Sequence, residues 1–322
     1  MLRTRAPSHP SPPPYLVGRQ RRLTLPASGP PESRAPRRSS GVIFECVVNL
    51  SEGRDDVVLA ELAAAASPLL LDVHRDPHHH RSVFTLAGEA DPLAAAARHL
   101  AEATVARLEL TGHEGVHPRL GVLDVVPFTP YLPDGPPPTD LRQAVALRDD
   151  FARWLSRDLG VPSFLYGPLP GGADRTLPQL RRDAFATLAP DFGPPRPHRT
   201  AGATAVGARP VLVAYNVWVS ADDVARSVAR QIRRPRVRAL GLRVGDRAQV
   251  SCNLIDPADV GPAELYDAVA GLAAEAGGAV HGGELVGLLP RAILQAIPPG
   301  RWPELGLSAE ATVEARLERR SA

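Results

Sequence analysis

Lysine is absent from this 322-residue chain, so all 37 basic residues are arginines. Cysteine occurs only as Cys46 and Cys252, each inside an apolar stretch. This excludes a disulfide scaffold and is typical of buried thiols in a reducing cytoplasm. No apolar run approaches the roughly 18 residues of a membrane-spanning helix. The sequence therefore predicts a soluble, cytoplasmic protein with no membrane contact.

Excess positive charge is missing from most of the chain. Residues 1–40 contain eight Arg and one Glu, whereas the rest contains 29 basic and 34 acidic residues. A mildly acidic body offers no basic surface for nucleic acid, so no such partner is expected. The Arg- and Pro-rich residues 1–40 lack a signal-peptide core and are predicted to be disordered. A misassigned start, a natural disordered arm and a targeting peptide remain open as origins of this tail.

Apolar and polar residues alternate in a way that predicts the same element order twice. The first series is strand 42–48, helix 55–66, strand 69–74, strand 82–88, helix 91–110 and strand 121–128. A helix at 139–159, a strand at 162–167 and a short helix at 177–188 extend it. The second series is strand 210–219, helix 221–233, strands 236–243 and 247–255, helix 261–276 and strand 279–288.

The order β-α-β-β-α-β is that of the ferredoxin-like split βαβ unit. The predicted fold class is therefore α+β, with two tandem ferredoxin-like (βαββαβ) α/β sandwich subdomains and a cleft between them, where a small-molecule site is expected. The predicted divisions are the tail 1–40, an N-terminal subdomain 41–192, an inter-subdomain loop 193–208, a C-terminal subdomain 209–300 and a helical extension 301–322.

The densest cluster of reactive side chains runs from His113 to Arg119, and its first five residues satisfy the H-E-x-x-H pattern of zinc proteases. That pattern needs a continuous helix to bring both histidines onto one metal. Gly112, Gly115 and Pro118 oppose a helix here. As extended chain, His117 and Arg119 share a face, so that a base near neutral pKa lies beside a guanidinium able to hold a carboxylate. Taken alone, the spacing favours a turn cap and a solvated arginine.

Two further segments carry open alternatives. His78, His79 and His80, with His74 nearby, form either a solvated polar turn or a metal site, and their spacing matches no ligand signature. The loop 191–199 is either a stiff linker or one wall of an anion-binding cleft.

Several motifs resemble the glutamate formiminotransferase family. Residues 45–54, ECVVNLSEGR, are similar to the family opening ECVPNFSEGR. The segments HPRLG at 117–121 and LDVVPF at 123–128 are similar to EHPRMGA-x-DVCPF. Further blocks follow in order, and the resemblance covers roughly residues 42–297. No stretch resembles the cyclodeaminase domain found fused in some relatives.

The resemblance implies two ferredoxin-like halves and formimino transfer from N-formiminoglutamate to tetrahydrofolate, a co-substrate, without a metal. It implies that His117 is the catalytic acid/base. We expect Arg119, Arg196 and Arg199 to bind substrate carboxylates, and the family suggests a possible homodimer. The implied folate-contacting residues are Gly193, Pro194, Pro195, Arg196, Pro197, His198, Arg199, Thr200, Ala201 and Gly202.

Four positions depart from the family pattern. His74 replaces an acid, His80 an Asn, Val116 a Glu and Ala201 an aromatic residue. Replacing an acid by imidazole near the site changes the local charge and can shift the pKa of His117. A non-catalytic folate-binding module and a one-carbon transferase with a different donor are therefore alternatives, and a zinc-dependent hydrolase is a third.

Overall fold

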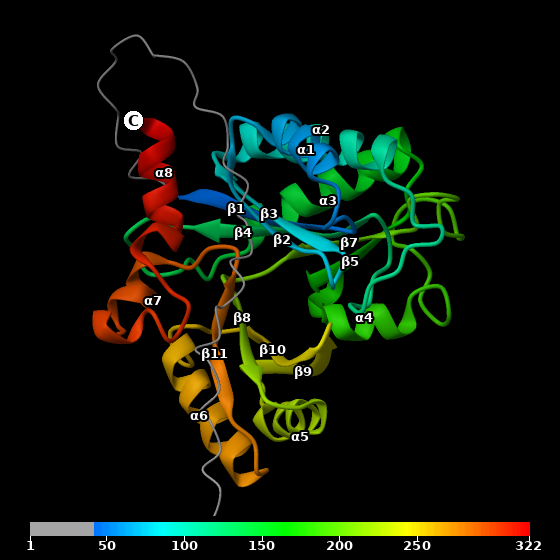
Figure 1. Ribbon diagram of the computed structural model, residues 1–322. Helices are drawn as coiled ribbons and strands as arrows, with labels where there is room; N and C mark the ends of the chain where they lie inside the picture. The colour runs from blue at the N-terminus through cyan, green and yellow to red at the C-terminus, as the bar shows by residue number, and fades with distance from the viewer. Residues whose placement is uncertain (1–41) are drawn as a thin grey trace, which may run out of the picture.

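The computed structural model describes residues 42–322, so the predictions for residues 1–40 lie outside the described residues. Figure 1 shows two β-sheets with helices on their outer sides. One sheet has seven strands and is mixed, and the other has four antiparallel strands. No helix within residues 42–322 combines the length and the apolar character needed to cross a bilayer.

The first half follows the predicted order of elements, with bounds within about three residues of the prediction. Its elements are β1 (Ile43–Leu50), α1 (Asp56–Ala66), β2 (Leu70–Asp76), β3 (Arg81–Gly88), α2 (Ala90–Arg107) and β4 (Leu123–Tyr131). Asp55 begins α1 by accepting hydrogen bonds from the amides of Val57 and Val58. The strands lie in the order β2-β3-β1-β4, and each neighbouring pair is antiparallel.

Three more strands extend this sheet beyond β4, which the prediction gave only in part. They are β7 (Thr204–Ala208), β5 (Ser163–Pro168) and β6 (Asp174–Arg175). In the chain, helix α3 (Arg142–Asp158) precedes β5, and helix α4 (Leu177–Asp183) lies between β6 and β7. The prediction of a loop over 193–208 is wrong for its last five residues, because β7 pairs in parallel with both β4 and β5. The sequence TAVGA has small side chains and no alternation, so it carries no strand signal.

The second half repeats the element order and confirms the second predicted series. It consists of β8 (Val213–Val219), α5 (Asp222–Ile232), β9 (Val237–Val244), β10 (Arg247–Leu254), α6 (Pro262–Glu275) and β11 (Val280–Val286). The strand order β11-β8-β10-β9 is equivalent to the order β4-β1-β3-β2 of the first half. Helices α1–α3 cover the outer face of the larger sheet, and α5 and α6 cover that of the smaller sheet (Figure 1).

Strand alternation separates an apolar face from a polar face in the first half. On β1, the side chains of Phe44, Cys46, Val48 and Leu50 belong to the core beneath the helices. The intervening residues of β1 face the second sheet instead. The inner surface between the two sheets is therefore free to carry polar groups.

The C-terminal residues return to the first sheet. After α7 (Arg291–Gln295), helix α8 (Val313–Ser321) packs beside β2 (Figure 1). Tyr131 Oη donates to Glu314 Oε1 at 2.7 Å, and Arg320 Nη1 donates to the carbonyl of Ala87 at 2.6 Å. Helix α8 lies within the segment 301–322 that was predicted as a helical extension, and it holds the second half to the first.

Candidate active site

The two inner sheet faces enclose a cavity of about 190 Å³. One wall comes from β1 to β5, and the other from β8 to β11. On the first wall, alternate residues of each strand reach the cavity, including Glu45 and Asn49 on β1, His74 and Asp76 on β2, and Arg81 on β3. Both charged and polar groups therefore meet at the place where the sequence predicted a cleft.

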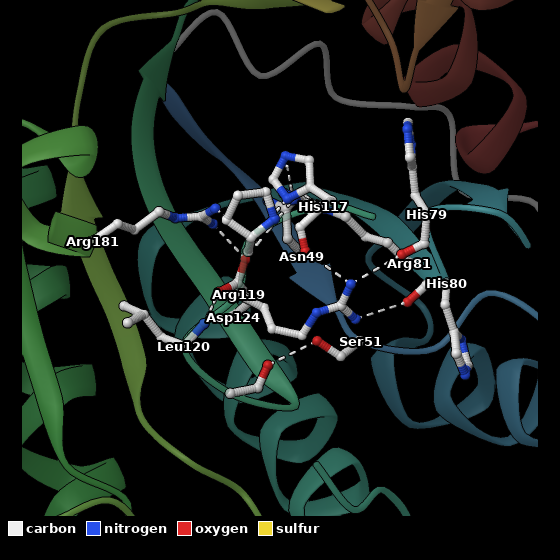
Figure 2. A network of polar contacts seen from close by, with 12 residues as sticks. Asn49, Ser51, His79, His80, Arg81, His117, Arg119, Leu120, Asp124 and Arg181 are labelled. Carbon is white, nitrogen blue, oxygen red and sulfur yellow. Dashed lines mark hydrogen bonds and ion pairs between the residues drawn. The ribbon is translucent and has the colours of Figure 1, made fainter. Parts of the chain in front are cut away.

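His117 lies in the irregular segment before β4, and its ring lines this cavity. Its Nδ1 is 2.8 Å from the carbonyl oxygen of Pro118, and Arg81 Nη1 is 2.6 Å from Nδ1 and 3.0 Å from Nε2. A carbonyl only accepts and a guanidinium only donates. With hydrogen on Nδ1 the ring would donate to Pro118 and accept from Arg81 at Nε2, whereas with hydrogen on Nε2 it would accept from Arg81 at Nδ1. Figure 2 shows the ring beside Arg81.

The electrostatic surroundings of His117 differ from the expectation of a base titrating near neutrality. Burial lowers the pKa of His117 strongly, and the positive charges of Arg81 and Arg181 lower it further. The imidazole is therefore neutral at physiological pH in this state. Arg81 lies within hydrogen-bond distance of both ring nitrogens, so the basic nitrogen becomes free only when that guanidinium moves to another partner.

Arg81 belongs to a buried charge cluster that the sequence reasoning did not identify. Asp124, only 2% exposed, accepts from Arg181 Nη2 at 2.5 Å and from the amide of Leu120 at 2.8 Å, and lies 3.8 Å from Arg81 Nη1. Arg81 also donates from Nε to Asn49 Oδ1 at 3.1 Å. The carboxylate of Asp124 thus balances two guanidinium groups beside His117 (Figure 2). An arginine directly after the His-rich turn, in a strand, was the available signal for Arg81.

Arg119 is placed differently from Arg81. Its Nη2 donates to the carbonyls of His117 at 2.9 Å and His79 at 3.1 Å, and its Nη1 lies 2.7 Å from the ring nitrogens of His113. These contacts fasten the segment before β4 to the β2–β3 turn (Figure 2). Arg119 is not among the residues that line the cavity, so its predicted binding of a substrate carboxylate stays a prediction.

The H-E-x-x-H pattern does not form a zinc-protease helix, because residues 113–117 contain no helical turn. The His113 ring donates from Nε2 to the carbonyl of Ser51 at 3.0 Å, whereas the His117 ring contacts Arg81. Within residues 42–322, no three His, Cys, Asp or Glu side chains gather in a way that could hold a metal ion. His113 and His117 therefore lie in different local environments.

The His-rich turn divides its three rings among three environments. His78 is exposed, His79 is 8% exposed and lines the cavity, and His80 stacks on His113 with ring centroids 4.1 Å apart. Asp76 Oδ1 orders the turn by accepting from the amides of His78 at 2.8 Å and His79 at 2.9 Å. The interpretation as a solvated turn fits His78 only.

The backbone conformation of His80 accounts for its replacement of the family's Asn. His80 has a φ of +48°, in the left-handed region that Asn and His tolerate better than β-branched residues. Its Nδ1 accepts from the amide of Gly53 at 3.2 Å, at a crossing so close that a Cβ on Gly53 would collide with the carbonyl of Asp76. The departure at position 80 therefore preserves the backbone.

We expect His80→Asn to change the free energy of unfolding by less than about 1 kcal/mol, because Asn adopts this conformation and its side-chain oxygen can accept from Gly53. His80→Val is expected to lose about 1–2 kcal/mol more, from strain at positive φ. Urea unfolding of both variants measures the difference. Equal stability of the two variants would contradict the explanation.

The predicted folate segment lies next to the His117 segment but outside the cavity wall. Most of residues 193–200 are exposed, and none of residues 193–202 lines the cavity. The end of the segment is fixed, because the carbonyl of Ala201 accepts from the amide of Val122 at 3.0 Å. Gly202 has a φ of +72°, and a Cβ there would collide with the carbonyl of Leu120. Of the other departures, Ala201 is buried and Val116 is 50% exposed.

Two buried carboxyl groups with unusual pKa values flank the cavity. Glu284 on β11 lies 3.8 Å from Nε2 of His74, and its Oε2 accepts from Asn216 at 3.2 Å and from Gln249 at 3.0 Å. Burial raises the pKa of Glu284 to about 7. Burial also raises the pKa of Glu45 to about 7, against the lowering effect of Arg209. The fourth departure, His74, therefore faces a carboxyl group across the two sheets.

Stability is expected to fall as the pH rises from about 5 to about 8. In the folded chain the pKa values of Glu45 and Glu284 are raised from 4.5 to about 7, so the folded state binds more protons than the unfolded state in this window. Glu284→Gln removes one of these groups and should reduce the fall by about 3 kcal/mol or less. Urea unfolding across the pH range measures this, with Glu61→Gln on the exposed side of α1 as control. A wild-type pH dependence in Glu284→Gln would contradict the assignment.

Residues 43–209 match the family model for the formiminotransferase domain, N-terminal subdomain. The glutamate formimidoyltransferase of Streptococcus pyogenes serotype M1 is 35% identical over 271 residues, covering 77% of this chain and 89% of that protein. The glutamate formimidoyltransferase of Thermoplasma acidophilum is 31% identical over 277 residues, covering 78% of this chain and 89% of that protein.

A longer relative has the same similarity over part of its length. The formimidoyltransferase-cyclodeaminase of Sus scrofa is 33% identical over 283 residues, covering 79% of this chain and 51% of that protein. The chain thus spans about half the length of that relative. The family model and the identity over most of the shorter relatives lead to one conclusion: the chain belongs to the formiminotransferase family.

Proposed function

We propose that this protein transfers the formimino group of N-formiminoglutamate to N5 of tetrahydrofolate, with His117 as the general acid/base. The observation that carries the proposal is the position of the His117 ring, which lines the inter-sheet cavity with Nδ1 tied to Pro118 and Nε2 facing Arg81. The two shorter relatives are glutamate formimidoyltransferases, which supports the same reaction.

The reaction requires one proton to move between two nitrogens. N5 of tetrahydrofolate attacks the amidine carbon, and His117 Nε2 takes the proton of the attacking nitrogen as the tetrahedral intermediate forms. The bond from carbon to the glutamate nitrogen then breaks, and His117 returns the proton to that departing nitrogen. The carbonyl of Pro118, 2.8 Å from Nδ1, stabilises the imidazolium between these steps.

Arg81 controls the basicity of His117 in this proposal. Its positive charge is, after burial, the largest cause of the lowered pKa of His117. When substrate draws the guanidinium toward a carboxylate or toward Asp124, the Nε2 lone pair becomes available and the pKa of His117 rises. Substrate binding and activation of the base are thereby joined in one movement.

The proposed organisation of the chain consists of two similar halves. Each half is ferredoxin-like, and the divisions at 41–192, 193–208, 209–300 and 301–322 describe the chain, with β7 assigned to the first sheet. Gly193–Gly202 is proposed to contact folate from beside the His117 segment. Both thiols, Cys46 and Cys252, are free and buried, which is compatible with the proposed cytoplasmic setting. A homodimer is proposed from the resemblance alone.

A second candidate function is a folate-dependent transferase with a different one-carbon donor. The observation that favours it is His74, which replaces the family's acid on the cavity wall and faces Glu284 at 3.8 Å. An imidazole there makes the wall more positive than a carboxylate would, and so alters which donor fits.

The test is to incubate the purified protein with N-formiminoglutamate and tetrahydrofolate and to measure released glutamate and formimino-folate together. Stoichiometric formation of both supports the proposed reaction. Tetrahydrofolate binding without glutamate release, followed by turnover with another formimino or formyl donor, would support the second candidate. Absence of both binding and turnover would overturn the assignment.

A further inference from the structure

We propose that Arg209 and Arg238, one from each wall of the cavity, form a carboxylate subsite that holds the glutamate end of tetrahydrofolate. This rests on the proposed function and assigns the other end of the same cavity. Arg209 directly follows β7 on the first wall, and Arg238 lies on β9 of the second wall. Tyr166 on β5 lines the cavity with them.

Neither guanidinium group is in direct contact with a carboxylate within the described residues, although the more distant Asp174 acts on Arg238 and Glu45 on Arg209. Arg209 Nη1 donates to the carbonyl of Pro210 at 2.9 Å, and in residues 42–322 neither arginine forms an ion pair with a carboxylate. By contrast, Arg81 and Arg181 share the carboxylate of Asp124. Two guanidinium groups without a directly bonded carboxylate, on opposite walls, are stabilised by an anion placed between them.

The pKa shift of Arg238 indicates that Arg209 lies near it. Burial lowers the pKa of Arg238, Tyr166 opposes this, the positive charge of Arg209 lowers that pKa further, and Asp174 opposes it to a smaller extent. Arg209 also acts on Glu45: burial raises the pKa of this carboxyl group to about 7, and the positive charge of Arg209 opposes the rise. Glu45 is therefore partly protonated at neutral pH and does not neutralise the pair.

The distance of the two arginines from His117 favours the glutamate carboxylates of tetrahydrofolate over the carboxylates of formiminoglutamate. The Arg81 side chain joins the His117 ring to Asn49, while Arg209 influences Glu45 at the other end of β1. Four residues of strand separate Asn49 from Glu45, or about 13 Å. The p-aminobenzoyl group separates N5 of tetrahydrofolate from its glutamate carboxylates by a span of this order. The carboxylates of formiminoglutamate lie only a few bonds from the reacting nitrogen and do not reach.

The experiment compares tetrahydrofolate with tetrahydropteroate, which lacks the glutamate, by calorimetric titration of the full chain. Wild type should prefer tetrahydrofolate by about 10- to 100-fold, the ratio expected for charge-assisted hydrogen bonds. Arg238→Met and Arg209→Met should each lose most of this preference while keeping the affinity for tetrahydropteroate. Arg238→Lys should restore part of it. Arg243→Met, on the same strand but exposed and paired with Asp222, should behave as wild type.

Two outcomes would overturn the subsite. If both Met variants keep the wild-type preference, the arginines do not hold the folate carboxylates. If instead Arg238→Met leaves that preference intact but raises the KM for formiminoglutamate, measured with tetrahydropteroate as acceptor, the carboxylate belongs to the donor. Turnover by the wild-type protein is measured in parallel in each experiment. Failure of wild type itself to bind tetrahydrofolate is a different result, which removes the proposed function as well.

Discussion

Replacement of His117 by alanine is expected to lower the rate of formimino transfer by about two to four orders of magnitude, the usual contribution of a positioned general acid/base. The loss should appear in kcat, because the imidazole acts on the proton that moves between the two nitrogens and is not proposed to bind either substrate. Steady-state rates with both substrates saturating measure this effect, and calorimetry with tetrahydrofolate checks that binding is kept.

The matched control for this prediction is His99→Ala, because His99 is an exposed histidine on α2, on the helix-covered side of the first sheet. It should keep wild-type kcat. A His117→Ala variant that retained more than about a tenth of the wild-type rate while folding normally would remove the imidazole from the chemistry. Loss of tetrahydrofolate binding in that variant would instead assign His117 to substrate positioning.

Asp124→Ala is expected to lower the free energy of unfolding by about 3–5 kcal/mol. Asp124 is 2% exposed, and its removal would leave Arg81 and Arg181 buried without their common carboxylate. It would also leave the amide of Leu120 without the acceptor that now lies 2.8 Å away. Urea or thermal unfolding measures the loss, and the variant should also release the segment that carries His117.

Asp150→Ala provides the comparison for Asp124, since Asp150 is an acid on α3 whose side chain is 68% exposed and paired with Arg153. An exposed pair of this kind contributes about 1 kcal/mol or less. Similar losses in the two variants would show that the Asp124 cluster does not stabilise the fold as described.

The element order could be predicted because most strands and helices carry their own periodic signal. The alternation along β1 and the apolar positions of α5 are visible in the sequence, and the structure confirms both elements. Strand β7 could not be predicted, since TAVGA acquires its strand conformation from pairing with β4 and β5 on either side. Small residues fit at that crowded centre, where the ring of Tyr166 packs against Gly207.

One part of the site could be predicted from a local motif, and the other part depends on residues that are distant in the sequence. The cavity position of His117 was predictable through a motif that is contiguous in the chain. The cluster of Arg81, Asp124 and Arg181 was not, because its members come from β3, β4 and α4 and meet only in the folded protein. Burial lowers the pKa of His117 most, and Arg81 and Arg181 lower it further, so the expectation of a near-neutral pKa lacked this tertiary information.

Helix α8 has a consequence for how substrates enter. The second half is joined to the first by the backbone that leaves β7 and again by α8, where Arg316 lies 3.3 Å from Asp72 and Tyr131 bonds to Glu314 at 2.7 Å. A lobe tethered at two places resists swinging about either tether alone. We therefore expect the two sheets to keep a nearly constant separation, and a ligand to enter the cavity between them without a hinge closure of the two halves.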